Sequence, residues 1–218
     1  QLASVIRLVE GGHLEQAIGI VKELGGHRKF IGLAECAESA ARMNQMDLAH
    51  VLLKQAEEGL KVVGLARIDA LRLELVSAYA AAGLEDMAVA AAAEVLDPEL
   101  RGTAIAARLK GVLPKDCDQA VSQLSELSAA KADASAAELF YRAKGLIEVL
   151  WVWTNSGLQL GEENSVKFCK QAFNLARASN LDMTDILLDA TDLLLNEGYQ
   201  DAASELIQPM RMSVPSMN

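Results

Sequence analysis

The chain has 218 residues, of which 51% are hydrophobic, 4% aromatic and 23% charged, and its formal net charge at pH 7 is −10. Ala and Leu dominate the hydrophobic half, while β-branched and aromatic residues are too sparse and too poorly alternated for a sheet, which argues against a sandwich, a barrel and a doubly wound fold. The apolar content excludes disorder, and the acidic balance argues against nucleic acid and anionic membranes as partners.

Apolar residues recur with the period of amphipathic helices along the whole chain, so we expect an all-α protein. Some helix ends carry clear signals: Asp97 precedes Pro98, and Ser135 with Glu138 forms a capping box. The pattern predicts twelve helices, at 2–10, 13–24, 28–43, 47–62, 65–82, 85–96, 98–110, 116–128, 135–155, 162–178, 183–196 and 200–212.

A short motif recurs between the two helices of a pair: a Gly or Asn stands five residues before an Ala. The Gly or Asn can adopt the left-handed conformation that ends a helix, and the small Ala permits two helices to cross closely. Each such unit is therefore predicted to be a helical hairpin. The motif occurs as GHLEQA (12–17), NQMDLA (44–49), GLEDMA (83–88) and GYQDAA (198–203).

Two weaker hairpins are predicted inside the long interval before the last motif. One turns near Pro114, where Asp116 caps the next helix with Gln119 at the capping-box position, and the other turns at 157–161. This gives about six hairpins. No low-complexity linker interrupts them, so we expect a single domain over 1–212, followed by a flexible C-terminal tail at 213–218.

The hairpins resemble tetratricopeptide repeats, and the third matches best. Leu75, Tyr79, Gly83 and Ala88 fall at the motif positions of that family, and EVLDP (94–98) resembles its closing segment. The other units keep the turn spacing but replace the aromatic residue with Leu8, Ala40 and Leu194. The resemblance implies a right-handed α-solenoid of antiparallel hairpins that serves as a non-catalytic scaffold or adaptor and binds a partner peptide or helix on its concave face.

The same resemblance places the first helix of each hairpin along the binding groove. The clamp that such repeats use for a C-terminal carboxylate needs Lys and Asn, whereas Glu38 and Ser77 stand there, so we expect apolar and neutral polar contacts to an extended or helical peptide. The related pentatricopeptide RNA readers need a basic surface, which this chain lacks. The groove residues carried over are Ile6, Ala34, Glu38, Arg42, Leu73, Ser77, Ala81, Trp151, Asn155, Leu188 and Asp192.

Trp151 and Trp153 stand two residues apart on one predicted helix, so they point in different directions. In one interpretation Trp151 packs inside and Trp153 fills a groove between hairpins. In the other, one of them anchors a partner, because exposed Trp is a frequent hot spot. The second interpretation gives the hypothesis that an apolar partner helix lies across Trp151 or Trp153, Asn155 and Leu188.

Five arginines recur near the starts of first helices. They are expected either to bridge adjacent repeats by pairing with Glu and Asp of neighbouring helices or to form a stripe for an acidic partner. They are Arg28, Arg67, Arg72, Arg101 and Arg108. A second charged series runs along one side of the eleventh predicted helix and is interpreted as a solvated acidic face in preference to a metal site. It comprises Asp182, Asp185, Asp189 and Asp192.

The residue patterns of catalytic sites do not occur, since there is no nucleophile in a sharp turn, no isolated carboxylate pair and no phosphate loop. We therefore expect no enzyme activity, no cofactor and no metal. The three histidines lack zinc spacing, and the three cysteines are expected to be reduced core thiols. These residues are His13, His27, His50, Cys36, Cys117 and Cys169.

The alternative function is a peptide-sensing regulatory module of a larger regulator or secretion component. A homodimer through the terminal hairpins is also expected, since Ala-rich end hairpins without a polar cap leave an apolar face. No stretch is long and apolar enough for membrane insertion. We expect a cytoplasmic protein, with a periplasmic or secreted one left open because the chain begins at Gln1 without a Met.

Overall fold

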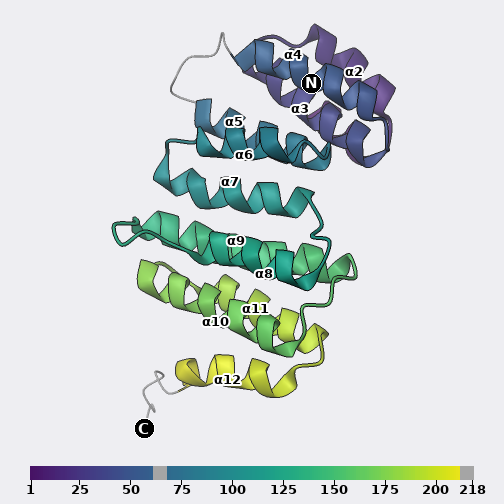
Figure 1. Cartoon of the computed structure of the whole chain (residues 1–218). Coiled ribbons are helices and arrows are strands. Elements are labelled where there is room, and N and C mark those ends of the chain that lie inside the picture. Colours follow the sequence, from purple (N-terminus) through teal and green to yellow (C-terminus); the bar gives the residue numbers. More distant parts are fainter. Residues whose placement is uncertain (61–67, 212–218) are drawn as a thin grey trace. The chain divides into compact units, whose positions relative to one another are not determined.

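The computed structural model describes residues 1–60 and 68–211, and this part of the chain consists of helices without any strand (Figure 1). The expected all-α class is thereby confirmed. The predicted tail at 213–218, the start of the predicted helix 65–82 and Arg67 lie outside the described residues. The twelve helices are α1 (Leu2–Glu10), α2 (Leu14–Glu23), α3 (Gly26–Arg42), α4 (Met46–Leu60), α5 (Ile68–Ala81), α6 (Glu85–Ala93), α7 (Pro98–Gly111), α8 (Cys117–Ser128), α9 (Ala136–Asn155), α10 (Glu162–Ser179), α11 (Thr184–Asn196) and α12 (Gln200–Arg211).

The chain divides into two compact units, Gln1–Val112 with α1 to α7 and Leu113–Asn218 with α8 to α12. The boundary falls between α7 and α8, which were predicted as the two halves of the fourth hairpin. The expectation of one domain over 1–212 stays a prediction.

In the first unit, helices that follow one another in sequence pack in pairs: α1 with α2, α3 with α4, and α5 with α6. A second set of contacts joins every other helix, α1 with α3, α3 with α5, and α5 with α7. Phe30, Cys36 and Val5 are among the fully buried side chains between them. The odd-numbered helices of this unit therefore form a continuous contacting series.

In the second unit, α9 contacts α8, α10 and α11, while α11 contacts α10 and α12. Trp153 and Phe168 are the largest fully buried side chains. The buried Arg142 pairs with Glu138 at 3.1 Å and donates to the carbonyl of Leu127 at 3.0 Å, which satisfies the C-terminal end of α8. This ion pair is therefore a structural tie between α8 and α9.

The turns have the predicted chemistry. In five of them, a residue with a positive φ ends one helix, and the next N–H donates to the carbonyl five residues earlier, as in Leu84 to Tyr79 at 2.9 Å and Leu158 to Trp153 at 3.0 Å. We call these five positions the turn residues. They are Gly12, Asn44, Gly83, Gly157 and Gly198, with φ of 75°, 60°, 68°, 88° and 87°.

A small buried residue occupies the fourth position of every even-numbered helix. In each case its side chain is at most 1% exposed, so no larger side chain fits without separating the helices. The sequence motif identified four of these residues, and the structure adds Ala120 of α8 and Ser165 of α10 as equivalents. The set is Ala17, Ala49, Ala88, Ala120, Ser165 and Ala203.

Candidate functional site

A cavity of about 530 Å³ lies in the first unit, against α1 and α3. Ile6 and Val9 give it an apolar side, and Glu38 and Arg42 are among its polar residues. The structure thus brings together Ile6, Glu38 and Arg42, three of the residues that the repeat resemblance placed along a groove. Ala34, another of that set, is 2% exposed and contributes to the core instead.

Carboxylates dominate the charge of this cavity. Glu10, Glu35 and Glu38 all line it, and its one guanidinium, Arg42, forms an ion pair with Glu38. Burial raises the pKa of Glu35, and the negative charges of Glu74, Glu38 and Glu10 raise it further against a smaller opposing effect of Arg42. The cavity is therefore a partly buried site with an excess of negative charge.

The neighbouring helix α5 continues this acidic character. Burial first, and then the charge of Glu38, raise the pKa of Glu74. Because α3 and α5 are in contact, Glu35, Glu38 and Glu74 act on one another across two helices. Leu73 and Ser77 of α5 are half-buried, so both retain some accessible surface.

Residues at a fixed distance in sequence before the turn residues occupy equivalent positions on the odd-numbered helices. Six residues before each turn residue is a position that is never buried, and we call it the groove position; it holds Ile6, Glu38, Ser77, Trp151 and Asp192. Nine residues before is a position we call the acidic position. It holds Ala3 in the first helix and then Glu35, Glu74, Glu148 and Asp189.

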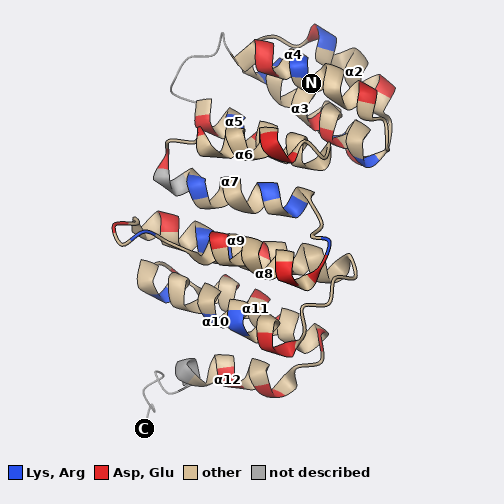
Figure 2. Ribbon diagram, viewed as in Figure 1, with Lys and Arg blue, Asp and Glu red and all other residues tan. Residues whose placement is uncertain are grey.

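The sequence prediction missed Glu10, Glu35 and Glu74. The repeat register could have found Glu35 and Glu74, because the same position is acidic in four of the five aligned helices. Acidic residues occur on most helices in Figure 2, in keeping with the net charge of −10. The acidic position is distinguished from the other acidic residues only by its constant distance from the turn residues.

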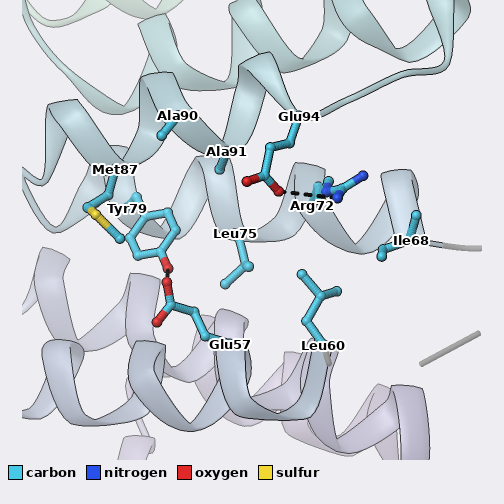
Figure 3. Close-up of a pocket in the computed structure, with 10 residues that line it drawn as sticks. All are labelled: Glu57, Leu60, Ile68, Arg72, Leu75, Tyr79, Met87, Ala90, Ala91 and Glu94. Atoms are coloured by element: carbon cyan, nitrogen blue, oxygen red, sulfur yellow. Dashed lines mark hydrogen bonds and ion pairs between the residues drawn. The ribbon is translucent and has the colours of Figure 1, made fainter. Parts of the chain in front are cut away.

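A second cavity of about 430 Å³ lies among α4, α5 and α6 (Figure 3). The hydroxyl of Tyr79 donates to Glu57, and burial followed by that hydrogen bond raises the pKa of Tyr79. Arg72 pairs with Glu94 at 3.2 Å and with Asp69 at 2.9 Å. The polar side chains of this cavity are thus paired with one another across helices, although the buried Nε of Arg72 has no hydrogen-bond partner among the described residues.

The arginine series does not form one stripe. Arg72 pairs with Glu94 at the end of α6, which is a neighbouring helix of the same predicted hairpin, so this ion pair does not bridge adjacent repeats. Arg108 is buried, whereas Arg28 is exposed. Side chains that differ this much in accessibility do not present a common surface to an acidic partner.

The two tryptophans of the second unit reverse the first interpretation, in which Trp151 packs inside. Trp153 is 0% exposed, and Trp151 is the half-buried one, with its indole Nε1 donating to the carbonyl of Asp189 at 3.3 Å. The turn residue Gly157 accounts for this, since Trp153 stands four residues before it, as Tyr79 stands before Gly83. Trp153 is therefore a core residue, and the hypothesis that it anchors a partner is wrong.

Trp151 joins α9 to α11, where two further predicted groove residues are accessible. Leu188 is 56% exposed, and Asp192 is exposed one turn later. Asn155, the last residue of α9, is also exposed. In the second unit the structure thus leaves Trp151, Asn155, Leu188 and Asp192 available to solvent in part or in full.

The remaining candidate ligands do not converge. Within residues 1–60 and 68–211, no group of three or more His, Cys, Asp or Glu side chains is placed to hold a metal ion. Cys36 and Cys169 are buried free thiols, as predicted, and burial raises their pKa to about 11 and about 12. Cys117 differs from the prediction because it is only half-buried.

Comparisons with protein-family models, with curated proteins and with solved structures gave no match to this chain. Across the described ranges, none of the helices combines the length and apolar character needed to cross a lipid bilayer.

Proposed function

We propose that this chain is a non-catalytic protein-interaction scaffold. In this proposal its helix pairs are antiparallel, tetratricopeptide-like hairpins of a right-handed α-solenoid. A peptide or helix of another protein then lies across the odd-numbered helices. Paired contacts between consecutive helices, and contacts between successive odd-numbered helices, support such an arrangement in each unit.

The two helices of a pair differ in a way that favours this function. The even-numbered helices use a small buried residue at their fourth position for close packing. The odd-numbered helices keep their groove position accessible in all five aligned cases, with side chains as different as Ile6, Glu38 and Trp151. A position that varies in chemistry but stays accessible suits recognition better than packing.

The groove position is therefore the single observation that carries the proposal. A photoreactive amino acid placed at Glu38 of the first unit, or at Asp192 of the second, is expected to cross-link a partner protein in a lysate of the source cells. Matched controls place it at Glu58 of α4 and Lys170 of α10, which are exposed residues of even-numbered helices. These should give no such product.

The proposal is overturned if the folded protein yields no specific product from either groove position, or if the even-numbered helices capture the same partner equally well. Capture of a short peptide in place of a protein would favour the peptide-sensing regulatory module.

A further inference from the structure

The solvent-exposed face of α11 carries an apolar ridge. Leu188 is 56% exposed and Leu195 is 49% exposed, and the two stand seven residues apart. Seven residues are close to two helical turns, so both side chains lie on the same face, about 10.5 Å apart along the axis. Leu181, in the turn before the helix, is 46% exposed. A regular spacing of this kind fits a partner that is itself helical.

The core of the second unit does not account for this ridge. The opposite face of α11 is already buried through Ile186, Leu187, Ala190, Leu193 and Leu194. A surface helix of a soluble protein normally has one apolar face, whereas α11 has two. The outer leucines are thus available for a contact outside the unit.

Aspartates line one side of the ridge. At 100° per residue, Asp192 lies about 40° and Asp185 about 60° from Leu188 around the helix, both on the same side of the ridge. Asp189 follows at about 100°, and its carbonyl is held by Trp151. The helix Thr184–Asn196 contains these three aspartates and neither Lys nor Arg. Its accessible surface therefore combines apolar contact with negative charge.

The negative charge beside the ridge favours a cationic partner over a second copy of this chain. A second copy docked with α11 antiparallel to α11 would place aspartates opposite aspartates, and any second copy adds a protein whose net charge is already −10, which is unfavourable. A helix with an apolar spine and flanking cations is complementary in both respects. The acidic position, which recurs as Glu35, Glu74 and Glu148 on other odd-numbered helices, has the same preference.

We propose that α11 docks a basic amphipathic helix of a partner protein, whose apolar residues pack on Leu188 and Leu195 and whose Lys or Arg side chains face Asp185 and Asp192. This inference rests on the proposed scaffold function and names the chemistry of its partner. Apolar packing provides the contact area, and the charges select the partner and its orientation.

Synthetic helices test the inference on the full chain. One labelled peptide of about twenty residues, long enough to hold a helix, carries a Leu and Ala spine flanked by Lys. A second carries Glu in place of Lys, and a third has the composition of the first with its Leu residues scattered around the helix. By fluorescence anisotropy, the first should bind at least about tenfold more tightly than either of the others.

Two pairs of variants locate the site. Leu188→Ser should weaken binding of the Lys peptide about tenfold, while Val51→Ser, which changes a residue of equal exposure on α4, should leave it unchanged. The double variant Asp185→Asn with Asp192→Asn should weaken binding about fivefold at low salt. Its control, Asp118→Asn with Asp201→Asn, makes the same charge change on α8 and α12 and should have no effect.

Equal binding of the Lys and Glu peptides, or unchanged binding to Leu188→Ser, overturns the inference. A dimer in light scattering that Leu188→Ser converts to a monomer also overturns it, because the occupant is then a second copy. If the peptides fail while the photoreactive residue at Asp192 still captures a protein, the partner chemistry is wrong and the scaffold function stands. If the peptides fail and neither Glu38 nor Asp192 captures a protein, the scaffold function fails too.

Discussion

The substitution Gly111→Ala tests the close packing of successive odd-numbered helices. Gly111 is the last residue of α7, and a Cβ added there would lie 2.5 Å from the Cβ of Ala80 and 3.0 Å from the backbone of Ala80 and Ala81 on α5. Ordinary contacts of a Cβ begin at 3.4 Å. Because two of the contacted atoms belong to the backbone, no side-chain rotation relieves the clash, and α5 and α7 must separate by several tenths of an ångström.

The size of the effect follows from two opposing contributions. Replacing Gly by Ala inside a helix stabilises it by up to about 1 kcal/mol, and less at its last residue. Overpacking a tight contact costs about 1–3 kcal/mol. Gly111→Ala should therefore lower the free energy of unfolding by about 1–2 kcal/mol. In a unit of this size, that lowers the melting temperature by roughly 4–8 °C.

Gly19→Ala is the matched control. Gly19 lies inside α2, and nothing lies within 4 Å of its added Cβ, so the same chemical change should raise the free energy of unfolding by about 0.5–1 kcal/mol. Urea unfolding followed by far-UV circular dichroism measures both variants. If Gly111→Ala is as stable as the parent chain while Gly19→Ala gains stability, then α5 and α7 do not approach this closely. The packing on which the proposed binding face depends is then wrong.

Two further predictions concern titratable groups. Because the pKa of Glu35 and Glu74 is raised in the folded chain, each favours folding below the unfolded pKa near 4.5 and loses that contribution as pH rises through the folded pKa. Glu35→Gln and Glu74→Gln should thus be more stable than the parent at pH 7 and no more stable at pH 4, as measured by urea titration at each pH. Among the thiols, a maleimide at pH 8 should modify the half-buried Cys117 first, while Cys36 and Cys169 stay protonated and react only on unfolding, as peptide mass spectrometry would show. Equal rates at the three sites would contradict this.

The sequence predicted the helices and turns well because each depends on one local property. Gly83 and Asn44 were identified as helix ends from their tolerance of positive φ, and both have it. Asp116 was identified as a cap, and its side chain accepts from the N–H of Gln119 at 2.8 Å. Ala88 was identified as a crossing point from its size, and it is 0% exposed.

The sequence analysis was less successful where a side chain's role depends on other helices. Trp151 and Trp153 are both large and apolar, so periodicity alone does not say which one faces the core. The interpretation that packed Trp151 inside was the reverse of the structure. Ala34 was placed along the groove although its size suits the helix contact where it is buried. The repeat register assigns Trp153 to the core once it is extended to the turn at Gly157, because the same position holds the buried Ala40, Tyr79 and Leu194. It does not decide Ala34, because Leu73 and Leu188 stand at the same position and are half-buried and exposed.

The acidic position shows why charge was the hardest feature to predict. A single Glu on an amphipathic helix is normally a solvated residue, and Glu35 or Glu74 alone gives no other indication. Only when α3 contacts α5 do their charges act on each other and on Glu38. A carboxylate whose pKa is raised destabilises the folded chain at neutral pH, so folding alone does not account for this arrangement. Burial is the larger cause of both raised pKa values, and a cationic partner would offset only the part that comes from repulsion between the carboxylates, which links the stability of these helices to their recognition chemistry.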